Sequence, residues 1–343
     1  MLIQKSKFLS IILICSLLIG FCQLSEAAPN RNSVLGNIVA VDNNDNLYVA
    51  QFGGDFWISY NQGEKYTHKS FKGLIWDLKV YHNKIYVLSQ DSDHPVIFVS
   101  SDKGKNFQQI NVPYNCVPQE LVVDSKENIY IATFGAGILI IHNDAKKSIE
   151  IKNHVNSNLL YDCLENIFID KNDKIYATPH EELDVRTNGV SISKVEKGKL
   201  IFDSKNLDLT NKSLLTGINV DSVGNIYISA YGDIGLVKSK DGGKNFFVLT
   251  TLSPLIYGEY IDKANIIYLV GRDEYFTPIL LVSYDLGSNF YSYSKESGLD
   301  GGYLESLAVD SKGNIYTTGS DDDYIFIGKS SGKKITFVKS QLK

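Results

Sequence analysis

Four glutamates stand at similar places in the chain, each three to five residues before an aspartate of a recurring phrase. They are Glu120, Glu165, Glu259 and Glu305. Clustered carboxylates can act as a general acid and base, or they can bind a divalent cation through their oxygens. We therefore take these four residues as candidates for ligand binding or catalysis.

Other polar and aromatic residues fall in the segments that vary most between copies of the phrase. The further ligand-binding candidates are Trp76, Asp77, Arg186, Tyr231 and Arg272. A divalent cation could be bound by His94, His180 and Glu181, although no HxxxH or comparable spacing supports such a site. The alternative is that these loop acids are simply solvated, as loop charges often are.

The elements that would position these residues come from a phrase that recurs seven times, for example VDSKENIYIA and VDSVGNIYIS. Its tyrosines, spaced 38 to 51 residues apart, are Tyr48, Tyr86, Tyr130, Tyr176, Tyr227, Tyr268 and Tyr316. A period of about 40–45 residues with several short strands per repeat is typical of a β-propeller. We predict an all-β fold, a seven-bladed β-propeller with four antiparallel strands per blade.

The fifth repeat shows how one copy would form a blade. Strands are predicted at 216–220, 225–230, 236–239 and 245–250, separated by turns rich in Asp and Gly. Four antiparallel strands make one blade. The Asp turns then share one face of the propeller, and the variable loops that carry the candidate residues share the other, where binding groups usually lie.

A second motif, Ser-x-Asp/Asn-x-Gly-x-x-aromatic, occurs at 59–66, 100–107, 239–246 and 283–290. It resembles the Asp-box, or BNR repeat, and covers four of the seven repeats. The resemblance implies a structural role for Asn61, Asp102, Asp241 and Asp285, on the face away from the ligand. We assign the repeat tyrosines to packing between blades as well, with hydroxyls that reach a backbone partner.

Propellers with Asp-boxes include sialidases and glycanases. The arginine triad of a sialidase is not supported, since only Arg31, Arg186 and Arg272 follow the N-terminal segment. A hydrolase that uses two carboxylates stays open. The phrase VDSVGNIY also resembles repeats of NHL-type and streptogramin-lyase propellers, which implies an alternative chemistry with histidine and glutamate around a divalent metal.

The first 27 residues have the layout of a cleaved signal peptide: Lys5 and Lys7, then the apolar run 8–21, then Ser25-Glu26-Ala27. We predict a secreted or periplasmic protein with one propeller domain over residues 28–343 and no later membrane span. Its net charge of −5 does not favour nucleic acid. Cys116 and Cys163 occupy similar positions in adjacent repeats, so a disulfide between them is a candidate in an oxidising compartment.

Together these patterns favour an exported binding module that uses an acidic, aromatic-rich loop face. Its partner would be a glycan, a cation, a small molecule or a protein. The alternative is an exported glycoside hydrolase or a metal-dependent lyase at the same face. The fold alone does not separate the two.

Overall fold

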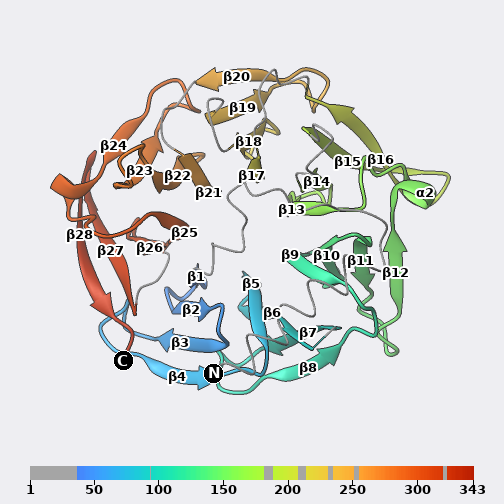
Figure 1. Ribbon diagram of the computed structural model, residues 1–343, viewed down its shortest axis with the longest axis horizontal. Coiled ribbons are helices and arrows are strands. Elements are labelled where there is room, and N and C mark those ends of the chain that lie inside the picture. Colours follow the sequence, from blue (N-terminus) through green and yellow to red (C-terminus); the bar gives the residue numbers. More distant parts are fainter. Residues whose placement is uncertain are drawn as a thin grey trace.

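The computed structural model describes residues 37–92, 94–180, 188–207, 214–230, 235–250, 255–319 and 323–343. Within these residues seven four-stranded antiparallel sheets are arranged around a central axis (Figure 1). The predicted seven-bladed β-propeller is therefore confirmed. In the described part of the chain, no helix is long and apolar enough to cross a membrane.

Each blade consists of four consecutive strands, with the first nearest the axis (Figure 1). Blades one to four contain β1 (Asn37–Val41), β2 (Leu47–Gln51), β3 (Asp55–Ser59), β4 (Thr67–Ser70), β5 (Leu74–Tyr81), β6 (Lys84–Asp91), β7 (His94–Ser100), β8 (Gln108–Asn111), β9 (Val117–Val123), β10 (Ile129–Phe134), β11 (Gly137–Ile141), β12 (Ile149–Lys152), β13 (Leu164–Ile169), β14 (Ile175–Pro179), β15 (Gly189–Glu196) and β16 (Lys199–Asn206). Blades five to seven contain β17 (Leu215–Val220), β18 (Ile226–Ala230), β19 (Gly235–Ser239), β20 (Phe247–Thr250), β21 (Leu255–Ile261), β22 (Ile267–Arg272), β23 (Pro278–Ser283), β24 (Tyr291–Tyr293), β25 (Leu304–Val309), β26 (Ile315–Gly319), β27 (Tyr324–Ser331) and β28 (Lys334–Gln341). Two short helical turns, α2 (His154–Ser157) and η2 (Lys295–Ser297), lie between blades.

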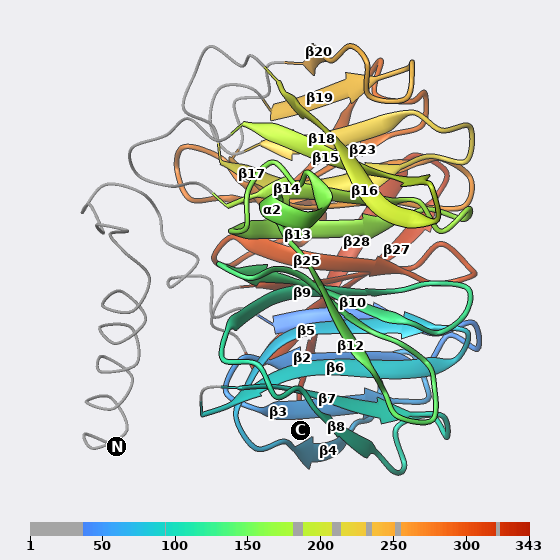
Figure 2. The same ribbon diagram turned by 90° about the vertical axis from the view of Figure 1, so that its right-hand side faces the viewer.

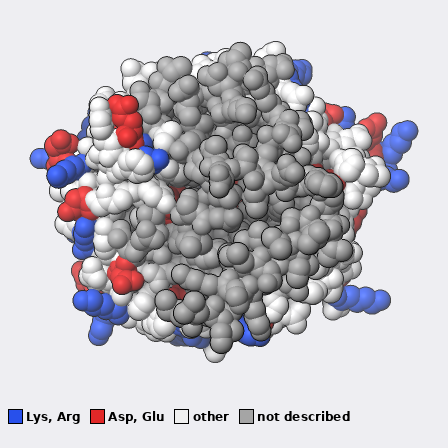
Figure 3. Space-filling view, in the orientation of Figure 1, with Lys and Arg blue, Asp and Glu red and all other residues white. Residues whose placement is uncertain are grey.

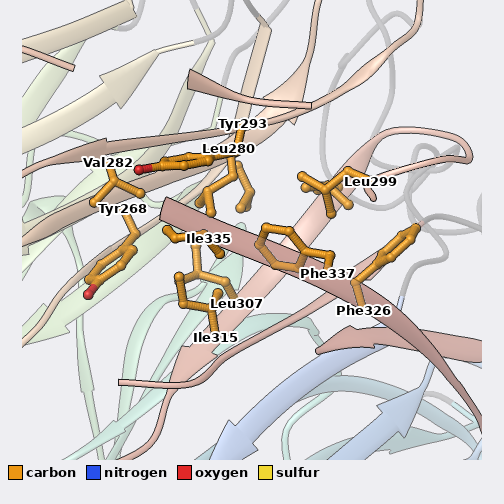
Figure 4. Close-up of a cluster of buried hydrophobic side chains, with 12 residues drawn as sticks. Tyr268, Leu280, Val282, Tyr293, Leu299, Leu307, Ile315, Phe326, Ile335 and Phe337 are labelled. Atoms are coloured by element: carbon orange, nitrogen blue, oxygen red, sulfur yellow. The ribbon is translucent and has the colours of Figure 1, made fainter. Parts of the chain in front are cut away.

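The core consists of apolar side chains packed between neighbouring blades. Figure 4 shows one such cluster, in which Tyr268 and Val282 of blade six meet Ile315 and Phe337 of blade seven. These residues alternate along their strands with side chains on the opposite face of the sheet, where the next cluster forms. Because both faces of each blade are buried near its middle, the second and third strands read as nearly continuous apolar runs, as in β10 and β11.

The ring closes through direct contacts between blades seven and one. The Ser306 hydroxyl accepts a hydrogen bond from the Val39 amide at 3.2 Å, and Tyr66 and Ser340 bond through their hydroxyls at 3.1 Å. Asp45 accepts bonds from the amide and the hydroxyl of Ser311, both at 2.9 Å. Among the described residues, each blade is complete in itself, so these polar contacts and the apolar core hold the two ends together.

The repeated aspartates organise the turn between the first and second strands of a blade. In blade five, Asp221 accepts bonds from the amides of Val223 and Asn225 at 3.1 and 2.8 Å, and from the Asn225 side chain at 2.6 Å. The Tyr227 hydroxyl donates to the same carboxylate at 3.2 Å. Backbone amides that the turn would leave unpaired are thus satisfied by one side chain.

The expected role of the repeat tyrosines needs one correction. Their rings pack between blades, as predicted, with Tyr130 partly buried and the others buried. However, six hydroxyls donate to the carboxylate of the repeated aspartate and not to the backbone. The pairs are Tyr48–Asp42, Tyr130–Asp124, Tyr176–Asp170, Tyr227–Asp221, Tyr268–Asp262 and Tyr316–Asp310. Six residues separate the partners in every pair, so a constant sequence spacing sets a constant contact.

The Ser-x-Asp/Asn turns lie between the third and fourth strands. In blade two, Asp102 accepts from the Ser100 hydroxyl at 2.8 Å and from the Asn106 amide at 2.9 Å. Gly104 has a φ of 82°, and a Cβ there would lie 2.6 Å from the Ile58 side chain of blade one. The turn therefore requires glycine both for its left-handed backbone and for its approach to the neighbouring blade.

Candidate functional site

The two faces of the disc are built differently. We call the face that carries the Asp turns the turn face, and the opposite one, with the connections from second to third strands and between blades, the loop face. Figure 2 shows the disc edge-on, with one face at the left and the other at the right. Figure 3 views it in the orientation of Figure 1, and described side chains of both charge signs stand around its rim.

A β-bulge near the start of the first strand is the most regular feature at the loop-face end of the axis. In blades two to seven, one extra residue interrupts the pairing of the first strand with the second. The six bulge residues are Trp76, Gln119, Glu165, Thr216, Tyr257 and Glu305. Bulges re-aim side chains and are enriched next to functional sites.

The bulge separates the four glutamates, which the sequence suggested were equivalent. Glu165 and Glu305 are bulge residues, Glu120 directly follows the bulge at Gln119, and Glu259 lies two residues after the bulge at Tyr257. Side chains on successive residues of a strand point to opposite faces. The four glutamates therefore occupy three different positions in the register and do not form a single set.

The residue after the bulge links its blade to the next one. Asp77 accepts from the Leu121 amide at 2.9 Å, and Glu120 accepts from the Ile167 amide at 2.8 Å. The first strand of each blade is an edge strand of its sheet. The amides on its unpaired side therefore need hydrogen-bond acceptors from elsewhere. Lys79 lies 2.7 Å from Glu120 and 3.5 Å from Asp77. Burial raises the pKa of Asp77, and the two carboxylates together raise the pKa of Lys79 against the effect of its own burial. Asp77 and Glu120 are thus engaged in holding blades two, three and four together.

Glu259 occupies space that a glycine of the neighbouring blade five leaves free. Directly after the bulge of blade five lies Gly217, where a Cβ would stand 2.7 Å from the Glu259 side chain. The Asn219 amide group donates to Glu259 at 3.0 Å. Burial raises the pKa of Glu259 to about 7. This carboxyl group therefore changes its charge near neutral pH.

Glu165 and His180 form a pair on blade four. The Glu165 side chain is 1% exposed and bonds through its carboxylate to Nδ1 of His180, whose side chain is 25% exposed. The Phe134 ring meets the imidazole edge-on at 5.1 Å between centroids. A buried carboxylate that orients a partly exposed histidine is an arrangement that can support general acid–base chemistry.

The predicted metal ligands are not brought together by the described residues. His94 begins β7 on blade two and pairs across the hairpin with Asp91, whereas His180 follows β14 on blade four. Glu181, Arg186 and Tyr231 lie outside the described residues. Among those that are described, no group of three or more His, Cys, Asp or Glu side chains is placed to bind a metal ion.

Aromatic side chains occupy the loop-face ends of blades two and six. Trp76 meets Phe52 edge-on at 5.5 Å, and its buried indole Nε1 has no hydrogen-bond partner among the residues that the structure describes. On blade six, Arg272 ends β22 and donates from Nε to the Tyr257 hydroxyl at 2.9 Å. The Arg272 guanidinium carbon lies 3.7 Å from the centroid of the Phe276 ring.

Sequence reasoning missed the ring of bulges and the contact between Arg272 and Phe276. Bulges depend on strand pairing, which one chain segment does not reveal. The aromatic contact had a local signal: Phe276 stands three residues after Asp273, a position that the repeated turns fill with Asp, Glu, Asn or Gly. The structure forms no disulfide between Cys116 and Cys163, so the expected pairing is not seen.

Comparison with known proteins gives the fold and no family. No protein-family model and no curated protein matches the chain. A virginiamycin B lyase from Staphylococcus aureus is 12% identical with a TM-score of 0.62, over 83% of this chain and 92% of that one. The YCF48 protein bound to the D1 peptide is 12% identical with a TM-score of 0.61, over 90% and 94%. A GH74 xyloglucanase from Xanthomonas campestris is 12% identical with a TM-score of 0.66, over 90% of this chain and 54% of that one.

Proposed function

We propose that this chain is a non-catalytic binding module whose loop face, at the mouth of the central axis, takes up a glycan or another ring-bearing ligand. The observation that carries the proposal is the ring of bulges. The backbone feature is the same in six blades, whereas the side chain it presents is of five different types. A fixed scaffold with variable side chains is how propellers and other repeat folds build ligand sites.

The state of the acidic residues favours binding over catalysis. Asp77 and Glu120 accept bonds from the backbone of the next blade, and Glu259 accepts one from Asn219. By contrast, aromatic rings remain accessible: Tyr275 is 79% and Phe276 is 64% exposed. Such rings suit stacking against sugars or other flat ligands.

The structural neighbours fit a ligand at this face, although they differ in chemistry. The solved proteins include a lyase with quinupristin, a xyloglucanase and a protein bound to a peptide. We further propose that residues 1–27 are a cleaved signal peptide, that residues 28–343 form the mature domain outside the cytoplasm, and that the Ser-x-Asp/Asn turns are Asp-boxes. The sequence patterns support these three points.

A thermal-shift screen of the protein against neutral and acidic oligosaccharides, basic peptides and divalent cations tests the proposal. A ligand bound to the native state raises the unfolding midpoint by mass action. We expect a sugar to raise it, and expect the shift to be lost in Trp76→Ala and reduced in the better-folding Trp76→Phe. The matched control is Tyr60→Ala, an exposed aromatic on the turn face. A screen with no response, or equal loss in the control, would refute the proposed face.

A second candidate is the hydrolase or lyase, and the pair of Glu165 and His180 favours it. A virginiamycin B lyase among the solved neighbours carries a histidine-to-alanine change and is catalytically inactive. If this chain is an enzyme, His180→Ala would abolish turnover of the ligand found in the screen and leave its binding intact. Turnover that survives in His180→Ala would remove this candidate.

A further inference from the structure

Arg272 is a partly buried cation in an acidic protein. The chain carries a formal net charge of −5, and among the described residues no carboxylate forms an ion pair with Arg272. The side chain is partly buried, and its recorded contacts are the Tyr257 hydroxyl and the Phe276 ring. Partly buried arginines are normally paired. Their pairing partner can also be a ligand.

The contacts with Tyr257 and Phe276 fix the guanidinium of Arg272 and leave its two terminal amino groups available for a ligand. Arginine has five N–H donors in one plane. One of them, on Nε, is directed to Tyr257, and the Phe276 ring covers one side of the plane at 3.7 Å. The terminal amino groups make no hydrogen bond with the described residues. A pair of parallel N–H donors matches the two oxygens of a carboxylate.

The backbone conformation of Phe276 is strained, which is a second and independent observation. Its φ is 63°, a left-handed conformation that is an outlier for a bulky residue. The turn is built like the repeated ones, since Asp273 accepts from the amides of Tyr275 and Thr277 at 2.9 and 2.8 Å. An easier residue such as Asn or Gly would satisfy this turn. Backbone strain of this kind is found mainly where the side chain has a functional role.

The surroundings suggest that the ligand carries a ring beside its anionic group. Tyr275 and Phe276 expose most of their surface, and the Phe276 ring lies against Arg272. The nearby acids oppose an anion in general: Glu274 is exposed, and Asp273 uses one oxygen within its own turn. Selectivity would therefore come from the guanidinium fork and the ring surface, since the local field does not attract anions.

We propose that Arg272, held by Tyr257 and Phe276, is the anchor for the carboxylate of a ring-bearing ligand. This inference rests on the proposed function and names the ligand chemistry of that same face. The ring is either a sugar, as in a uronic acid, or an aromatic ring, since both kinds stack on exposed aromatic side chains such as Phe276. The two sources share the carboxylate, and the experiment separates them.

Binding to the full protein is measured by calorimetry or by NMR titration with two matched pairs of probes. Glucuronate is compared with glucose, and benzoate with benzyl alcohol. We expect one carboxylate to bind at least tenfold more tightly than its neutral partner, and Arg272→Gln to remove that advantage. Lys72→Gln is the matched control, because it also removes one positive charge from the loop face but alters a side chain that is 80% exposed and paired with Asp91.

The outcomes are distinct. A preference for glucuronate that is lost in Arg272→Gln and kept in Lys72→Gln supports a uronic acid, and the same result with benzoate supports an aromatic acid. Equal affinity for charged and neutral probes, equal loss in both variants, or no binding of any probe overturns the carboxylate anchor. The proposed function then stands or falls separately on the neutral sugars and on Trp76→Ala. Arg272→Lys guards against misfolding, since it keeps the charge and should retain the wild-type unfolding midpoint while losing most of the advantage.

Discussion

Two turns of blade six have the same backbone conformation, but one bonds to the neighbouring blade and the other presents an exposed ring. Asp262 on the turn face and Asp273 on the loop face each accept from the amides two and four residues later. Each turn has a left-handed residue three positions on, Asn265 with φ 62° and Phe276 with φ 63°. Asn265 bonds to the amide and the hydroxyl of Ser222 in blade five, whereas Phe276 stacks on Arg272 and faces solvent.

The difference shows how the chain divides its side chains between stability and recognition. On the turn face the left-handed residues of blades one, four and six bond to the neighbouring blade through Asp45, Asp173 and Asn265. On the loop face the corresponding residue of blade six makes no such link to a neighbour and presents an exposed ring. Equal backbone geometry therefore does not imply equal function.

The largest effect on stability is expected when Asp262 and Asp273 are each replaced by alanine, in separate variants. Asp262→Ala would remove two backbone bonds and leave the hydroxyl of Tyr268, which is 5% exposed, without its acceptor. We expect a loss of about 4 kcal/mol in the free energy of unfolding. Asp273→Ala removes two bonds at the surface and should cost only about 1 kcal/mol. Urea unfolding of both variants measures the difference.

Similar losses in the two variants would contradict this division of roles. Tyr268→Phe serves as the control, since it removes the buried hydroxyl together with its bond. It should cost less than Asp262→Ala, because no polar group is left unpaired.

The carboxyl groups of the two regions should respond to pH with opposite signs. Burial raises the pKa of Glu259 to about 7 from 4.5, so the native state holds this proton more tightly than the unfolded state. Its contribution to stability is complete below pH 4.5 and is lost as the pH rises through 7. Glu259→Gln removes this dependence, and at pH 8 its free energy of unfolding should exceed that of the parent by about 3 kcal/mol.

Asp102 on the turn face is the matched comparison. Hydrogen bonds, first of all from the Asn106 amide, lower its pKa to about 2 from 3.8. Its contribution is complete above pH 3.8 and is lost as the pH falls through 2. Urea unfolding of Glu259→Gln and Asp102→Asn between pH 2 and 8 should therefore give difference curves of opposite slope. Curves of the same sign would show that hydrogen bonds such as that from Asn219 stabilise the Glu259 anion by more than its burial costs.

The fold was predictable because its determinants are local and repeated. Asp221 and Tyr227 are six residues apart, and the same spacing recurs in five other blades, so the sequence period shows the structural period. The strands of blade five begin and end within about two residues of the predicted bounds. The tyrosine hydroxyl was assigned to the wrong partner because a side-chain acceptor six residues away cannot be distinguished from a backbone one by pattern alone.

The candidate site was predictable only as a face. The four glutamates looked equivalent by their distance from the repeated aspartates, but a bulge shifts the register by one residue and sends them to different neighbours. Glu259 finds room only because Gly217 of the preceding blade has no side chain. Such contacts join residues about 40 positions apart, and no property of either segment alone indicates them.

The smallest effect, and the most direct test of the comparison, comes from making the two turns of blade six alike. Phe276→Asn places at the loop face the residue that the turn face already uses. Asparagine tolerates the left-handed conformation better than phenylalanine, so we expect the free energy of unfolding to rise by about 1 kcal/mol. The reverse exchange, Asn265→Phe, should lower it by at least as much, because it adds strain and also removes the two bonds to Ser222.

If Phe276→Asn lowers stability instead, the ring stabilises the fold through Arg272 by more than the backbone strain costs, and its exposure is a by-product of packing. A gain in stability means that the chain keeps the aromatic ring for a purpose other than folding.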